Sequence, residues 1–149
     1  MDEKNKIDKK ILLEQYKLYV EMADRISQRR QSANNYFISV NIFLFSFFSY
    51  LQYIKFNIGA FIIFSAGIIV CFVWYRLIKS YKGINSGKFK VIHEMEKNLS
   101  YQPYKIEWEK IGKGNDKKLY QPFTKIELYV PWVFSILYAI FILIILFSS

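Results

Sequence analysis

The chain has 149 residues, which is the size of a single domain, and its 21 Lys and Arg against 12 Asp and Glu make it basic. Apolar residues make up 53% of the sequence, but they are separated from the charged residues along the chain, as is typical of membrane proteins and not of soluble domains. The single cysteine, Cys71, excludes an internal disulfide. The sequence has no cluster of Cys and His that would predict a metal site. We expect no removable signal peptide, because the sequence begins MDEKNKIDKK.

Three stretches of the chain lack charged residues, and each is long enough to cross a bilayer as a helix of about 20 residues. These stretches are Gln31–Ile54, Phe56–Tyr75 and Leu128–Ser149. We therefore predict an all-α integral membrane protein, organised as one membrane domain over residues 1–149. Its three transmembrane helices are predicted at 33–54, 56–76 and 128–147. The segment 1–31 is predicted as a cytoplasmic helix and 77–126 as a helical cytoplasmic loop.

The distribution of Lys and Arg predicts the orientation, because basic residues favour the cytoplasmic side. Eight lie before residue 31, twelve lie within 76–127, and the first connection carries only Lys55. We expect a multi-pass protein of the bacterial cytoplasmic membrane with a cytoplasmic N-terminus and an external C-terminus. Arg25, Arg29 and Arg30 are predicted topology anchors that end the first helix at the headgroups and attract membrane lipids, anionic ones included. An aromatic belt is expected at Tyr36, Tyr50, Tyr53, Trp74, Tyr75, Tyr129 and Trp132.

The predicted cytoplasmic segments show helical periodicity. In 8–30, apolar residues recur at spacings of three and four, at Leu12, Tyr16, Tyr19, Ala23 and Ile26. This helix packs either on the chain's own inner loop or on a neighbouring subunit, and a position on the membrane surface is the alternative. Gly83 and Gly87 are expected to weaken the second helix, which resumes to about Leu99. "YKIEWEKI" is a helix or a strand, with helix favoured, between turns at Gln102-Pro103, Gly112–Gly114 and Gln121-Pro122.

The start of the last span carries a helix-capping pattern. Thr124 and Glu127, three residues apart before an apolar run, form a predicted capping box. Pro131 then lies inside the predicted helix, where it removes one backbone donor, so a kink is expected.

A polar stripe lies on one face of the first predicted span. Asn35, Ser39, Ser46 and Ser49 fall within a narrow arc of an ideal helix. Such a stripe either holds helices of an oligomer together or lines a water-filled pore. Small residues form a similar face at Ala60, Gly67 and Cys71, and another at Ser135 and Ala139, which favours close assembly. No ionisable residue lies at mid-depth in any span, which argues against an ion-coupled transporter.

The remaining motifs do not indicate an enzyme. "GINSGKFK" has three residues between its glycines and Phe89 after its lysine, so it fails the phosphate-loop pattern. His93 has no evident nucleophile or substrate to serve as a base. The basic loop Lys110–Lys118 has no interleaved aromatic residues that would indicate nucleic-acid binding. We predict no catalytic, cofactor or metal residues and no nucleic-acid partner.

Four blocks resemble the RipA family of small octameric bacterial membrane proteins, over nearly the whole chain. The blocks are YKLYVEMADRISQRRQSANNYF, SYKGINSGKFKVIHEMEKNL, PYKIEWEKIG and LYQPFTKIELYVPWVF. The resemblance implies a homo-octamer in the cytoplasmic membrane, associated with intracellular survival of a pathogen, and no reaction. The architecture is also similar to the SLATT group of membrane hairpins, presumed pore-type effectors of bacterial conflict systems.

Together these observations predict a non-enzymatic homo-oligomer, octameric by the resemblance, that scaffolds or organises membrane partners and has a role in stress or host survival. Its charged inner surface would dock a cytoplasmic protein partner. The alternative is an oligomeric pore or a membrane-permeabilising effector of a bacterial defence system.

Overall fold

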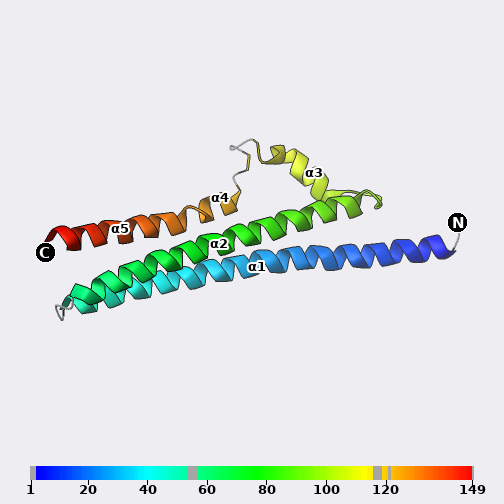
Figure 1. Cartoon of the computed structure of the whole chain (residues 1–149). Helices are drawn as coiled ribbons and strands as arrows, with labels where there is room; N and C mark the ends of the chain where they lie inside the picture. Colours follow the sequence, from blue (N-terminus) through cyan, green and yellow to red (C-terminus); the bar gives the residue numbers. More distant parts are fainter. Residues whose placement is uncertain (1–2, 54–56, 116–118, 121, 149) are drawn as a thin grey trace. The chain divides into compact units, whose positions relative to one another are not determined.

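The structure is a computed structural model that describes residues 3–53, 57–115, 119–120 and 122–148, and its described residues contain helices and no strand (Figure 1). The all-α class is therefore confirmed. The helices are α1 (Glu3–Tyr53), α2 (Asn57–Glu96), α3 (Pro103–Lys110), the short 3-10 helix η1 (Gly112–Gly114), α4 (Phe123–Glu127) and α5 (Val130–Ser148).

The two long helices run past the ends that the sequence suggested. α1 does not end at Arg29 and Arg30, but continues as one helix of 51 residues. α2 is one helix of 40 residues, without an interruption at Gly83 or Gly87. A charged or glycine residue costs a helix at most about 1 kcal/mol, which packing of the neighbouring turns outweighs. The predicted end of the first helix was therefore wrong, and the expected weakening at the two glycines does not interrupt the second helix.

The same two glycines give a first testable prediction. A Cβ built on Gly83 or Gly87 meets no atom within 4 Å. Replacing both by alanine should therefore stabilise the purified protein by about 1 kcal/mol per site, because alanine is the better helix former. Thermal unfolding in detergent measures the change. A loss of stability or of subunits would contradict the prediction, and would show that another copy of the chain packs closely on this face.

The helix favoured for YKIEWEKI, residues 104–111, is confirmed as α3 at Pro103–Lys110, and so is the turn that follows it. α3 begins at Pro103, a residue suited to the first turn of a helix because it needs no backbone donor there. After α3, the backbone turns through Gly112, Lys113 and Gly114, all with positive φ. Lys113 is the non-glycine residue of this turn and adopts φ 55°. Two glycines at such positions avoid the steric cost that a Cβ would add.

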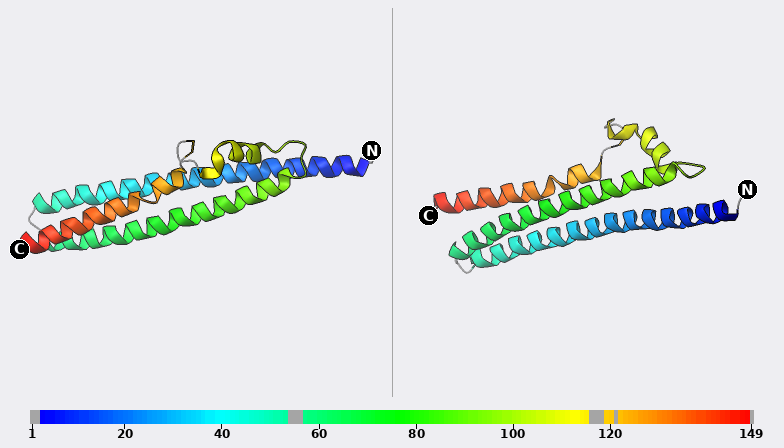
Figure 2. Two further views of the ribbon diagram at one scale, coloured as in Figure 1. Left: turned by 90° about the horizontal axis from the view of Figure 1, so that it is seen from above. Right: turned by 45° about the vertical axis from the view of Figure 1, so that its right-hand side comes forward.

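The chain divides into two compact units. Unit 1 comprises residues 1–29 and 81–122, and unit 2 comprises residues 30–80 and 123–149. In unit 2, the C-terminal part of α1 and the N-terminal part of α2 lie side by side and antiparallel, and α5 packs along them (Figures 1 and 2). In unit 1, Tyr16 in the first half of α1 and the first turn of α3 both bond to Glu96 at the end of α2. In sequence, unit 2 contains the three apolar stretches and unit 1 contains most of the charged residues.

Two segments of the described chain are long and apolar enough to cross a membrane. They are Gly59–Glu96, within α2, and Phe123–Phe147, which covers α4 and α5. The second and third predicted spans are thus supported, whereas the first, at 33–54 in α1, does not qualify. Its asparagines and serines lower its mean hydropathy, so among the described residues two spans, and not the predicted three, qualify by length and composition.

The last span is broken at its start, near the predicted kink. α4 ends at Glu127 and α5 begins at Val130, with Pro131 as its second residue. Proline cannot donate to the carbonyl four residues before it, and its ring clashes with that carbonyl, so the helix is interrupted. Pro131 itself is fully buried. The prediction of a distortion at Pro131 is confirmed, as a break between two helices.

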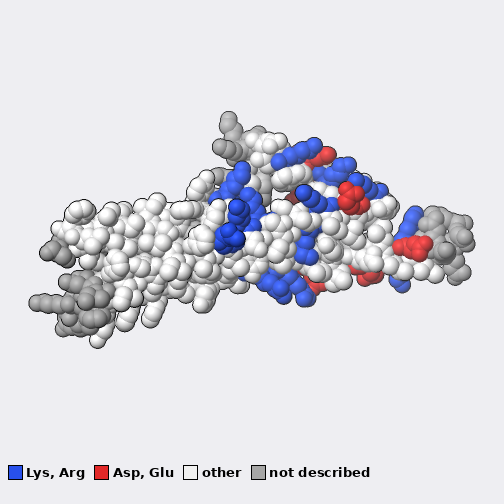
Figure 3. Space-filling model, viewed as in Figure 1, with Lys and Arg blue, Asp and Glu red and all other residues white. Residues whose placement is uncertain are grey.

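Charge is segregated on the molecular surface. On the face drawn in Figure 3, the apolar helices of unit 2 show no Asp or Glu and end at a cluster of Lys and Arg. Within Phe123–Phe147, only 11% of an apolar stretch of 18 residues is buried in the chain, so most of this stretch is open to lipid or to another subunit. A soluble protein rarely exposes so large an apolar surface.

Candidate functional site

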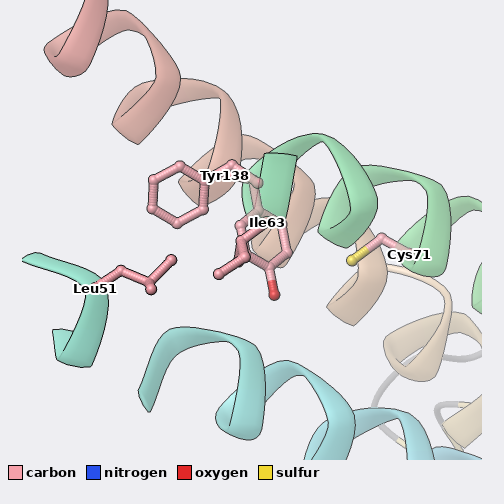
Figure 4. Close-up of a cluster of buried hydrophobic side chains, with 5 residues drawn as sticks. Leu51, Ile63, Cys71 and Tyr138 are labelled. Carbon is pink, nitrogen blue, oxygen red and sulfur yellow. The ribbon is translucent and has the colours of Figure 1, made fainter. Parts of the chain in front are cut away.

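The core of unit 2 is an aromatic cluster where three helices meet. Its buried residues come from α1, α2 and α5, and Tyr138 and Phe64 are both 0% exposed. The Tyr138 ring stacks on Phe45 with centroids 4.7 Å apart. Figure 4 shows Tyr138 reaching from α5 towards Ile63 of α2. Such aromatic contacts add to the dispersion energy that holds helices together where no water is present.

One buried asparagine joins α1, α2 and α5 by hydrogen bonds. Asn41 of α1 is 0% exposed, and its Oδ1 accepts from the Tyr138 hydroxyl at 2.7 Å. The Cys71 thiol of α2 also donates to this oxygen, with a sulfur–oxygen distance of 3.4 Å. The Asn41 amide donates to the Phe37 carbonyl at 2.7 Å. Every polar group of this cluster has a partner, which is the condition for placing it in an apolar core.

A second buried contact involves Asn34, two helical turns before Asn41 on α1. The Trp74 indole N–H of α2 donates to Asn34 Oδ1 at 2.8 Å, and the Trp74 ring stacks on Phe37 at 5.7 Å. Trp74 is 1% exposed, so its predicted place in an interfacial aromatic belt is wrong. Its body packs in the helix interface and its N–H is satisfied there. Of the other predicted belt residues, Tyr36, Tyr50, Tyr129 and Trp132 are exposed, Tyr75 is half-buried, and the Tyr53 side chain lies outside the described residues.

Arg30 joins α1 to α4. Its Nη1 donates to the Thr124 hydroxyl at 2.9 Å, and its Nε lies 3.1 Å from Glu127 Oε2. The latter contact is an ion pair without an aligned hydrogen bond. The Arg30 side chain is only 15% exposed and that of Glu127 22%. The predicted anchors differ accordingly: Arg29 and Arg25 are exposed, with Arg25 paired to Glu21 at 2.7 Å, whereas Arg30 is held within unit 2.

The structure also corrects the predicted helix cap. α4 begins at Phe123, so Thr124 is its second residue and not the residue that caps it. The side chains of Thr124 and Glu127 bind Arg30 instead of the helix backbone. A cation 94 residues earlier in the chain outweighs the local backbone donors, since hydrogen bonds to a charged group are the stronger ones.

Reversing the charge of Arg30 should therefore weaken unit 2. Arg30→Glu places two carboxylates together in a poorly solvated site, and we expect a loss of about 2 kcal/mol. Adding Glu127→Arg should restore most of it, whereas Arg25→Glu, in the exposed pair with Glu21, should cost less than about 1 kcal/mol. Thermal unfolding of the detergent-extracted variants measures all three. Equal losses for Arg30→Glu and Arg25→Glu, or no rescue by the double variant, would contradict the role given to Arg30.

The predicted polar stripe lies on the open side of α1. Asn35, Ser39, Ser46 and Ser49 are all exposed. Each serine hydroxyl donates to the carbonyl four residues earlier, at 2.9 Å for Ser39, 2.9 Å for Ser46 and 3.2 Å for Ser49. These hydroxyl protons are thus satisfied within the helix and need no water. The small-residue face predicted on α2 differs, since Ala60, Gly67 and Cys71 are buried in unit 2. On α5, Ser135 is half-buried and Ala139 is exposed.

In unit 1, a buried carboxylate joins three elements. Glu96, at the end of α2, is 0% exposed. It accepts from the Tyr104 and Lys105 amides in the first turn of α3, at 2.9 and 3.0 Å, and from the Tyr16 hydroxyl of α1 at 3.0 Å. An anion suits this position, because the first amides of a helix have no partner of their own and carry partial positive charge.

The tyrosines around Glu96 are held in their neutral form. Burial raises the pKa of Tyr16, and the hydrogen bond to Glu96 and the charge of that carboxylate raise it further. Burial also raises the pKa of Tyr104, followed by the charges of Glu107 and Glu96. The Tyr16 hydroxyl is therefore a donor to Glu96 at any physiological pH.

Unit 1 also shows what the predicted amphipathic helix packs on. Ala23 is buried, and Leu12, Tyr16, Tyr19 and Ile26 are half-buried, on the face that the periodicity indicated. Tyr16 bonds to Glu96, and Lys88 Nζ lies 4.5 Å from the Tyr19 ring centre. The first of the expected alternatives, packing on the chain's own inner segment, is observed.

The described residues contain no group of three or more His, Cys, Asp or Glu that would hold a metal ion. Sequence reasoning missed Asn34, Asn41 and Glu96. The asparagines are seven residues apart in an apolar helix. A polar amide is costly in such a helix, so this repeated asparagine was the available signal. Glu96 offered none, since its partner Tyr16 lies 80 residues earlier.

Comparison with known proteins identifies the family. The model of the octameric membrane protein family, 8xMP, matches residues 13–147, so the match includes α2 to α5 and most of α1. No curated protein and no solved structure shows a significant match. The expectation of an octameric membrane family is confirmed, while the narrower likenesses to RipA and to the SLATT group stay expectations. The chain belongs to the octameric membrane protein family.

Proposed function

We propose that the chain is the subunit of a homo-octameric, non-enzymatic assembly in the bacterial cytoplasmic membrane that organises membrane partners. Unit 2 lies in the bilayer, with α2, α5 and the C-terminal part of α1, which runs antiparallel beside α2, each crossing it. Unit 1 lies in the cytosol, where its charged surface docks protein partners. A role in stress or host survival fits such a scaffold. The observation that carries the proposal is that most exposed large apolar side chains lie in unit 2 and most charged ones in unit 1, in a family described as octameric.

The buried contacts of unit 2 favour a rigid scaffold over a protein that changes conformation, such as a transporter. Asn41 and Asn34 join helices through buried hydrogen bonds, and Arg30 does so through a hydrogen bond to Thr124 and an ion pair with Glu127, which together hold one arrangement in place. An ion-coupled transporter would instead keep ionisable groups at mid-depth. The polar stripe of α1 supports a contact between subunits, because its serine hydroxyls are bonded to their own helix and can face a neighbouring helix closely.

Cysteine labelling tests the orientation. In a Cys71→Ser background, Lys9→Cys in unit 1 should react with a membrane-impermeant maleimide only after cell lysis. Phe147→Cys near the end of α5, where the side chain is 87% exposed, should react in intact cells. The two positions form a matched pair, since each is exposed in the chain. Labelling of both from outside, or of neither after lysis, would contradict the proposed topology.

A pore is the second candidate, and the exposure of all four stripe residues is the observation that favours it. If the stripe lines a lumen, wild-type protein in vesicles should conduct ions, and Ser39→Leu with Ser46→Leu should abolish the flux. If the stripe joins subunits, the wild type should not conduct, and the double variant should yield fewer octamers on native gels. Ile42→Leu, on the same helix and 57% exposed, is the matched control.

A further inference from the structure

One exposed face of α2 changes from apolar to cationic along its length. Ile69, Phe72, Arg76 and Lys79 are spaced by three, four and three residues, so they follow one another on the same side of the helix. Ile69 is 65% exposed and Phe72 is 61% exposed, and both cationic side chains are exposed as well. This face belongs wholly to unit 2.

Among the described residues of unit 2, the cations of this face have no acidic partner. The described part of unit 2 contains four cationic residues, Arg30, Arg76, Lys79 and Lys125, and one carboxylate, Glu127. That carboxylate is 3.1 Å from Arg30 and therefore already neutralised. Within the described residues of unit 2, nothing anionic remains for the other three. On the surface drawn in Figure 3, Lys and Arg gather where the uncharged part ends.

Aromatic residues place this end of the face at a membrane boundary. Tyr75, next to Arg76, meets the Trp132 ring edge-on at 5.7 Å. Trp132 is 54% exposed and Tyr129 69%. Tyrosine and tryptophan with one apolar and one polar side concentrate at headgroup level, and Lys and Arg reach into the headgroups from the same depth.

We propose that this face binds an anionic phospholipid of the cytoplasmic leaflet. The headgroup phosphate lies on Arg76 and Lys79, and an acyl chain lies along Phe72 and Ile69. The guanidinium of Arg76 offers paired donors to phosphate oxygens, and Lys79 adds a second positive charge. A zwitterionic lipid binds more weakly, because its own ammonium group is repelled by the same cations. The inference rests on the proposed position of unit 2 in the membrane.

Native mass spectrometry of the full chain in detergent tests the site. Phosphatidylglycerol and phosphatidylethanolamine with identical acyl chains are titrated into the wild type and into Arg76→Gln with Lys79→Gln. The double variant should bind phosphatidylglycerol about tenfold to thirtyfold more weakly. Lys9→Gln with Lys10→Gln removes the same charge from exposed positions of unit 1 and should leave the affinity unchanged. Arg76→Lys should retain most of the binding, which shows that the site and not the fold is altered.

Several results would overturn the lipid site while the proposed function stands, because the same spectra report the octamer. One is that the wild type and the Gln variant bind phosphatidylglycerol with equal affinity. Another is that the wild type binds the two lipids with equal affinity. A third is that millimolar inorganic phosphate displaces phosphatidylglycerol. Disulfide formation between subunits through Phe72→Cys, in a Cys71→Ser background, would show a second copy on this face and would overturn it too. A wild type that is not an integral membrane oligomer would instead contradict the proposed function itself.

Discussion

Glu96→Ala is expected to detach α3 from the end of α2. The substitution removes the acceptor of two backbone amides and of the Tyr16 hydroxyl, all in a site where Glu96 is 0% exposed. Loss of a helix cap costs about 1 kcal/mol, and leaving further donors unpaired adds about 1–3 kcal/mol. We therefore expect unit 1 to lose about 3 kcal/mol. Hydrogen exchange measures it directly, because the Tyr104 and Lys105 amides should lose their protection.

Two further variants separate the buried role of Glu96 from a general effect of charge. Glu96→Gln keeps one acceptor oxygen and should retain part of the protection. Glu94→Ala, two residues away, removes an exposed carboxylate paired with Lys97 at 2.8 Å, and should change stability by less than about 1 kcal/mol. If Glu94→Ala and Glu96→Ala exposed the α3 amides equally, the capping role of Glu96 would be wrong.

Gly67→Ala should disrupt the packing of α2 on α5. A Cβ at residue 67 would lie 2.5 Å from Cζ of Tyr138 and 2.6 Å from its Cε2. The ring cannot move aside easily, because Tyr138 is 0% exposed, stacks on Phe45 and is bonded to Asn41. Overpacking of this kind costs about 1–3 kcal/mol. Thermal unfolding of the detergent-extracted protein measures the loss.

A double variant tests whether the clash is the cause. Tyr138→Leu removes the ring and destabilises unit 2 by itself, but Gly67→Ala added to it should cost much less than Gly67→Ala alone. Gly83→Ala is the matched control, since nothing lies within 4 Å of its Cβ position. Additive losses in the double variant would mean that the close approach of Gly67 to Tyr138 does not limit the packing.

The sequence predicted the features that depend on local patterns. The helical class, the apolar face of α1 around Ala23, the helix at 103–110 and the break at Pro131 all follow from periodicity or from the chemistry of single residues. The family, too, was indicated by local blocks of residues. Helix ends were harder to predict, because Arg29, Gly83 and Gly87 carry signals of about 1 kcal/mol that tertiary packing overrides.

The features that depend on distant contacts were not predictable. Asn35 and Asn34 are neighbours in sequence, yet the first is exposed and the second bonds to Trp74. An apolar helix in which both sides look alike gives no sign of which side meets its partners. Thr124 and Glu127 matched a local capping pattern, but Arg30 from another helix binds both. The candidate sites of this protein are therefore set by pairs of residues far apart in the chain.

The central claim is that the chain forms an octamer whose apolar unit lies in the bilayer. Alkaline carbonate extraction of membranes, followed by native mass spectrometry of the detergent-solubilised full chain, tests it most directly. The protein should remain in the membrane pellet and then give a particle of eight times the 17.9 kDa chain mass. Recovery without detergent of a monodisperse 17.9 kDa monomer would contradict the claim.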